Sequence, residues 1–143
     1  MKQSIDYIPK TINYKGNNIQ TYKIGTGEKI VLALPSFPHS GIYYLWFAQY
    51  YDLTKVTIIT FDLPGWIGQS DDIFKKGGFG FDLCIEIAKS VVDAYMPEKY
   101  GIIGYSFGGA LAAKLAHDDP RVNKVVLVSA VINSALLKGY GPY

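Results

Sequence analysis

The sequence predicts an α/β fold, a doubly wound and mostly parallel sheet that follows an N-terminal antiparallel hairpin. Short continuous apolar runs, which suit strands buried on both faces, alternate with stretches whose apolar residues recur at helical spacing. Ahead of them, two segments of strand character flank the turn residues KGNN. A chain that alternates buried strands with amphipathic helices builds a parallel sheet covered on both faces.

The hairpin comes first. Its strands are expected near 7–14 and 19–24, with Gly16, Asn17 and Asn18 between them. A tight hairpin turn needs residues that accept a positive φ, and glycine and asparagine are the commonest such residues. We therefore expect the turn to be centred on these three.

The remaining elements alternate. Buried strands are expected at 29–34, 55–61, 99–105 and 124–131. Helices are expected at 42–51, 82–96 and 107–119. The helix at 82–96 is amphipathic, because apolar residues recur every fourth position with charges between them. Prolines directly after the second and third helices stop them.

Length and composition exclude several classes of protein. The 143 residues predict a single domain spanning 1–143, and no linker divides the chain. The net charge is +2 and the basic residues form no continuous stripe, so nucleic-acid binding is not expected. No apolar run has the length of a membrane span, and no signal peptide is visible. With Cys84 as the only cysteine, a reducing, cytoplasmic location is expected.

GYSFGG, at 104–109, is the motif with the most chemical content. Gly104 to Gly108 fit G-x-S-x-G, directly after an apolar strand and directly before a helix of small residues. There Ser106 would sit on a tight turn, where a side chain at Gly104 or Gly108 would collide with a neighbouring element. The helix N-terminus would direct positive charge at the site, and the Phe107 N–H would bind an oxyanion. The alternative is a glycine-rich turn without chemistry, although nucleotide-phosphate motifs are absent.

Two more segments extend this pattern, and together the three resemble the α/β-hydrolase fold, in particular its esterase, lipase and peptidase-like members. LALPSFPHSG, at 32–41, is similar to the family's first oxyanion loop, H-G-F-P-x-S. FDLPGWIGQS, at 61–70, is similar to its D-x-[PR]-G-x-G-x-S loop. The resemblance runs from about residue 15 to 130 in the family's order. Two departures stand out: Pro35-Ser36 replaces His-Gly, and the second loop has one extra residue.

The resemblance implies roles for particular residues. Ser106 would be the nucleophile, and the backbone N–H groups of Phe107 and Phe37 would form the oxyanion hole. Gly104 and Gly108 would be the glycines of the nucleophile elbow. Asp62 would be structural and tie loops together.

The expected base is missing. A serine nucleophile needs a general base, and in this family the acid and then the histidine follow the serine along the chain. After Asp119 the sequence contains no Asp, Glu or His. His117 lies about 15 Å from Ser106 along the helix, out of reach. His39, in the oxyanion loop, is either an exposed loop residue or one that faces the substrate.

We therefore expect a partial domain that lacks the family's cap and last strands. The strand at 124–131 would be an apolar sheet edge, with Lys124 as its only charge. The front part of a longer hydrolase or a truncated product is favoured, and a complete small protein that dimerises through the open edge is the alternative.

The leading functional hypothesis is a serine hydrolase acting on an ester or related acyl compound, with no cofactor and no metal. Its rival is a non-catalytic protein that binds a small ligand or a partner, with aromatics such as Tyr43, Tyr44, Trp46 and Trp66 in a pocket or in the core. An acyltransferase or peroxidase-like activity stays open, because fold does not fix function. The sequence leaves the substrate undetermined.

Overall fold

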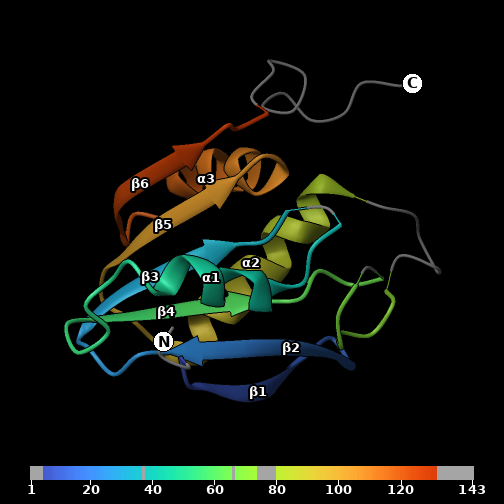
Figure 1. The fold of residues 1–143 in the computed structure, drawn as a ribbon. Coiled ribbons are helices and arrows are strands. Elements are labelled where there is room, and N and C mark those ends of the chain that lie inside the picture. The colour runs from blue at the N-terminus through green and yellow to red at the C-terminus, as the bar shows by residue number, and fades with distance from the viewer. Residues whose placement is uncertain (1–4, 37, 66, 74–79, 132–143) are drawn as a thin grey trace.

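A six-stranded mixed sheet forms the centre of the protein in a computed structural model that describes residues 5–36, 38–65, 67–73 and 80–131. The strand order is β1-β2-β4-β3-β5-β6, with β1 and β6 at opposite edges (Figure 1). Strands β2 and β4 pair antiparallel, whereas β4, β3, β5 and β6 run parallel to one another. The mostly parallel sheet with its antiparallel hairpin, predicted from sequence, is confirmed.

The hairpin is tighter than the sequence suggested. β1 (Tyr7–Tyr14) and β2 (Asn17–Ile24) pair up to Tyr14 and Asn17, so only Lys15 and Gly16 form the turn. Their φ angles are 47° and 85°. The expectation that the asparagines lie in the turn is therefore wrong, because a two-residue loop whose central residues both have positive φ matches the twist of the strands.

The four parallel strands lie close to the predicted ranges. They are β3 (Lys29–Leu34), β4 (Val56–Phe61), β5 (Tyr100–Tyr105) and β6 (Val122–Val128). The last one starts two residues earlier than predicted and ends three residues earlier. Its early end has a local cause, because Ser129 adopts a φ of 46° and so leaves the extended conformation.

Helices cover the two faces unequally. α2 (Phe81–Tyr95) and α3 (Phe107–Asp118) pack on one face. The other carries a 3₁₀ turn, η1 (Gly41–Tyr43), and α1 (Tyr44–Ala48), which lies in front of the sheet in Figure 1. The helix predicted at 42–51 is thus shorter, since its aromatic residues are modest helix formers and no side chain caps α1.

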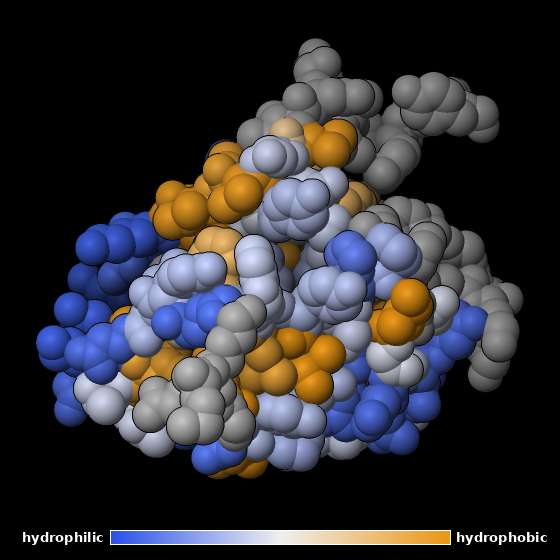
Figure 2. Space-filling model, in the orientation of Figure 1, coloured by the Kyte–Doolittle hydropathy of each residue, from blue (hydrophilic) through white to orange (hydrophobic). Residues whose placement is uncertain are grey.

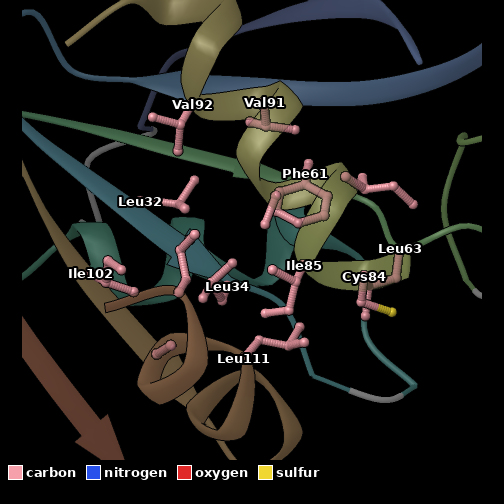
Figure 3. Close-up of a cluster of buried hydrophobic side chains, with 14 of the residues drawn as sticks. Leu32, Leu34, Phe61, Leu63, Cys84, Ile85, Val91, Val92, Ile102 and Leu111 are labelled. Carbon is pink, nitrogen blue, oxygen red and sulfur yellow. The ribbon is translucent and has the colours of Figure 1, made fainter. Parts of the chain in front are cut away.

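The larger apolar core lies between the sheet and the pair α2 and α3 (Figure 3). Labelled there are Leu32, Leu34, Phe61, Leu63, Cys84, Ile85, Val91, Val92, Ile102 and Leu111. A smaller cluster, which includes Ala33, Ile58 and Ile103, lies under α1. Burial raises the pKa of the Cys84 thiol to about 12, so this cysteine acts as a packing residue.

A buried carboxylate joins β5 to β6 at the end of the sheet far from the GYSFGG turn. Asp119 accepts hydrogen bonds from the Tyr100 hydroxyl at 2.9 Å and from the Arg121 backbone N–H at 2.9 Å. The Arg121 guanidinium also binds it, with Nη2 2.7 Å from Oδ2. Hydrogen bonds from this guanidinium lower the pKa of Asp119 to about 2.

Stability in acid should depend on this carboxylate. With a folded pKa of about 2 against an ordinary 3.8, ionised Asp119 stabilises the fold fully above pH 3.8, and the contribution is lost as pH falls toward 2. Asp119→Asn should lower the free energy of unfolding at pH 7 by about 2 kcal/mol and flatten its decline between pH 4 and 2. Urea unfolding at a series of pH values measures the free energy of unfolding at pH 7 and its decline in acid. The control Glu98→Gln, at an exposed carboxyl, should change neither quantity. Equal slopes in Asp119→Asn and wild type would contradict the assignment.

Candidate active site

Ser106 occupies a strained turn between β5 and α3. Its φ of 53° and ψ of −117° lie outside the regions that non-glycine residues favour. Three backbone hydrogen bonds hold the turn: the Ser106 N–H donates to the Val128 carbonyl at 3.0 Å, and the Ser106 carbonyl accepts from the N–H groups of Gly109 at 3.0 Å and Val131 at 3.1 Å. Strain that the surroundings hold in this way is typical of functional sites.

Glycines on either side of Ser106 allow backbone to approach backbone. A Cβ added to Gly104 would lie 2.1 Å from the Gly108 carbonyl oxygen. One added to Gly108 would lie 2.2 Å from the Leu34 carbonyl oxygen, at the end of β3. One added to Gly109 would lie 2.4 Å from the Ala130 Cβ. All three distances are too short for a side chain, so these glycines seat the start of α3 directly against the sheet.

Phe107 is the first residue of α3, so its backbone N–H belongs to the positive end of the helix. Its ring packs edge-to-face on Phe81, with ring centres 6.0 Å apart. The other expected oxyanion donor, Phe37, lies outside the described residues. Its neighbours Pro35 and Ser36 are buried, and the Pro35 carbonyl lies beside Gly108 in the turn.

The Ser106 side chain is half-buried and makes no capping bond to α3. Within the described part of the chain, neither of the two histidines hydrogen-bonds to it. His117 is exposed in the last turn of α3, at the end of the helix opposite Ser106. The structure therefore brings no base to Ser106 from the residues it describes.

A hollow of about 430 Å³ opens beside this turn, on the face that carries α1. Tyr105, which precedes Ser106, lines it, as does Val128, whose carbonyl binds the Ser106 N–H. Among the described residues, the lining is Pro35, Ser36, His39, Ser40, Tyr43, Tyr44, Trp46, Phe47, Ile103, Tyr105 and Val128. These described lining residues include no carboxylate, lysine or arginine, and aromatic rings supply much of the surface.

His39 lies in the wall of this hollow. It is half-buried, and its backbone N–H donates to the Ser36 carbonyl at 2.8 Å. Its imidazole ring stacks on the Tyr43 ring, with ring centres 4.2 Å apart. Of the aromatics expected in a pocket or core, Tyr44 is buried and donates its hydroxyl to the Leu34 carbonyl at 2.8 Å. Tyr43 and Trp46 are more than 60% exposed, and Trp66 lies outside the described residues.

Asp62, at the end of β4, is fully buried and gathers polar groups from three segments. One carboxylate oxygen accepts the Tyr22 hydroxyl at 2.7 Å and the Gln69 N–H at 2.8 Å. The other accepts the Gly41 N–H at 2.8 Å and the Ser40 hydroxyl. Burial, together with its bond to Asp62, raises the pKa of Tyr22. This carboxylate therefore ties β2 to both loops that follow the central strands.

The sequence pattern pointed to Asp62 but not to its partners Tyr22 and Ser40. Those hydroxyls lie 40 and 22 positions away, and no local spacing links them. Gly68 is the one nearby residue in the sequence that indicates a close contact with Asp62. Its φ is 153°, and a Cβ there would lie 2.5 Å from the Asp62 Cγ.

Two kinds of site are absent from the ranges that the structure describes. No three His, Cys, Asp or Glu residues come together as a metal site would require. No helix combines the length and the apolar character of a membrane span.

Comparisons with known proteins agree with this architecture. The thioesterase domain of the curacin biosynthetic pathway superposes with a TM-score of 0.81 at 20% identity, over 87% of this chain and 45% of that domain. A haloalkane dehalogenase from Agrobacterium tumefaciens superposes with a TM-score of 0.76 at 20% identity, over 89% of this chain and 43% of that chain. A meta-cleavage product hydrolase superposes with a TM-score of 0.75 at 26% identity, over 87% of this chain and 46% of that chain. The chain thus spans a little under half the length of each. No curated protein sequence matches it.

A family model supplies the remaining finding. The model described as the alpha/beta hydrolase fold matches residues 29–139, which is most of the chain. It covers the four parallel strands, the Asp62 loop and the GYSFGG turn. The chain belongs to the α/β-hydrolase fold family.

Proposed function

We propose that this chain carries the nucleophile and the oxyanion donors of a serine hydrolase that acts on an ester or a related acyl substrate. The observation that carries the proposal is the turn at Ser106, a strained serine between a buried strand and a helix N-terminus that surrounding glycines hold against the sheet. This is the arrangement of a nucleophile elbow, which exposes a serine hydroxyl at the N-terminus of a helix.

The chemistry follows from that geometry. The Ser106 Oγ attacks the acyl carbonyl carbon, and the carbonyl oxygen becomes an oxyanion. The N–H groups of Phe107 and Phe37 stabilise it, each worth on the order of 3 kcal/mol of barrier. The Ser106 proton passes to a histidine, which returns it to the leaving group, so water can then release the acyl group and restore the serine.

The histidine and its orienting acid come from outside residues 1–143 in this proposal. His39 and His117 are the only histidines in the sequence, and neither hydrogen-bonds to Ser106 in the structure. The lengths of the similar structures are consistent with this reading, since the chain covers 45% of the curacin thioesterase domain.

A non-catalytic ligand-binding role is the second candidate. The hollow beside Ser106 favours it, because an apolar, aromatic-lined concavity with a few polar groups is typical of small-molecule sites. This role needs no base, and Ser106 would then be a residue of a turn only.

Labelling by a fluorophosphonate separates the two candidates. An elbow serine with an oxyanion donor keeps residual reactivity without its base, so the folded chain should be labelled slowly at Ser106. Ser106→Ala should lose at least about tenfold of the label, whereas Ser90→Ala, in α2, should keep it. Peptide mass spectrometry locates the adduct. A folded chain without label, or equal labelling of Ser106→Ala, would contradict the enzyme.

The elbow should tolerate no side chain at Gly108. In Gly108→Ala the new Cβ meets the Leu34 carbonyl oxygen at 2.2 Å, so β3 and α3 must separate. We expect a loss of about 1–3 kcal/mol in the free energy of unfolding and loss of Ser106 labelling in the population that stays folded. Gly80→Ala is the matched control, since its nearest neighbour would be 3.7 Å away. Unchanged labelling in Gly108→Ala would argue against the close approach.

Asp62 acts in this proposal as a positioning residue. Asp62→Asn replaces an acceptor of several donors by an amide, whose NH₂ must then face another donor. Breaking a buried charged network of this kind costs about 3–5 kcal/mol, and labelling of Ser106 should fall as the Ser40 loop loosens. Asp71→Asn, at an exposed carboxylate that binds the Asn18 N–H, should cost under about 1 kcal/mol. Chemical unfolding compares them; equal losses would refute the assignment.

A further inference from the structure

The pairing of β3 with β5 ends just before the residues that carry the proposed chemistry. Leu34 and Gly104 are the last pair of the register. Pro35 follows Leu34, and a proline has no N–H to donate to a neighbouring strand. Ser106 lies two residues beyond Gly104, in its strained turn. A contact other than strand pairing is therefore needed to hold the end of β3 against that turn.

The side chain of Tyr44, the first residue of α1, makes such a contact. Its hydroxyl donates to the Leu34 carbonyl at 2.8 Å, and the residue is buried. Burial raises the pKa of this hydroxyl, and a hydrogen bond from the Tyr105 backbone acts against that increase. One side chain of α1 thus reaches both the last paired residue of β3 and the residue directly before Ser106.

The 3₁₀ turn η1, which directly precedes α1, fixes where Tyr44 lies. The Gly41 N–H donates to Asp62 at 2.8 Å, and the Ser40 hydroxyl binds the same carboxylate. A Cβ added to Gly41 would lie 2.4 Å from the Phe61 carbonyl oxygen, so η1 packs directly on the end of β4. The buried carboxylate therefore sets the start of α1, and through it the place of the tyrosine.

The rest of α1 packs by apolar contact. Its sequence, YLWFA, has no charged residue. Over this part of the face, side chains of intermediate or high hydropathy prevail, whereas strongly hydrophilic residues gather toward the left and the lower right (Figure 2). Apolar packing is non-directional, but a hydrogen bond constrains both distance and angle. The Tyr44 hydroxyl therefore sets how α1 is placed on the ends of β3 and β5.

We propose that Tyr44 is a positioning residue for Ser106, whose hydroxyl holds the ends of β3 and β5 at the start of the serine turn. The Leu34 carbonyl oxygen that it binds is also the atom that a Cβ on Gly108 would meet first, at 2.2 Å. A shift of this carbonyl therefore displaces the first turn of α3, whose N-cap is Ser106. The inference rests on the proposed function, because it names a residue that positions the nucleophile of that function.

Tyr44→Phe tests the proposal, because it removes the hydroxyl and keeps the ring. A fluorophosphonate should label the folded variant at Ser106 about tenfold more slowly than the wild-type chain, since misplaced reacting groups lose at least this much rate. Tyr100→Phe is the matched control: it removes a buried hydroxyl that binds Asp119 at 2.9 Å, at the far end of the sheet. It should keep the wild-type rate. Equal labelling rates in the two folded variants would overturn the proposal.

Amide hydrogen exchange, followed by NMR, tests the same contact without the chemistry. In Tyr44→Phe the amides of Tyr105 and Ser106 should exchange about fivefold faster than in the wild-type chain, while that of Ile102, in the middle of β5, changes less. An equal acceleration along all of β5 would indicate general destabilisation and overturn the positioning role. A folded wild-type chain that takes no label would refute the proposed function, and the exchange pattern would still decide whether Tyr44 holds the turn.

Discussion

Everything at the candidate site depends on the close approach of α3 to the ends of β3 and β5. Where a side chain would need more than 3 Å, the backbone atoms opposite Gly104 and Gly108 leave 2.1 and 2.2 Å. This contact forces the sharp turn from strand to helix, and the turn in turn forces Ser106 into its strained conformation. The helix N-terminus, the serine and the end of β3 thus meet because Gly104 and Gly108 have no Cβ.

The second requirement is that the loops around this turn keep their shape. Asp62 holds these loops in place through its buried carboxylate, which is stable only while hydrogen-bond donors surround it. Those donors come from β2, from the loop after β3 and from the loop after β4. A carboxylate of this kind makes three separate segments fold together, so the wall of the hollow that contains His39 is fixed by a residue outside the hollow.

The sequence predicted the order of strands and helices because buried parallel strands and small-residue helices leave strong periodic signals. It predicted the Ser106 turn because the glycines that permit it are adjacent in the chain. The positive φ at Lys15 was not predicted, since lysine rarely accepts a positive φ and only the strand twist imposes it there. The donors around Asp62 were missed as well, because their proximity is a product of the finished fold.

The unequal cover of the sheet connects these features. Parallel strands are normally buried on both faces, yet here the larger core lies under α2 and α3, and the five-residue α1 covers only part of the other face. The hollow lies where that cover stops, over Ile103 and Val128. The same strand, β6, therefore lines the hollow, anchors the Ser106 N–H and exposes an apolar edge.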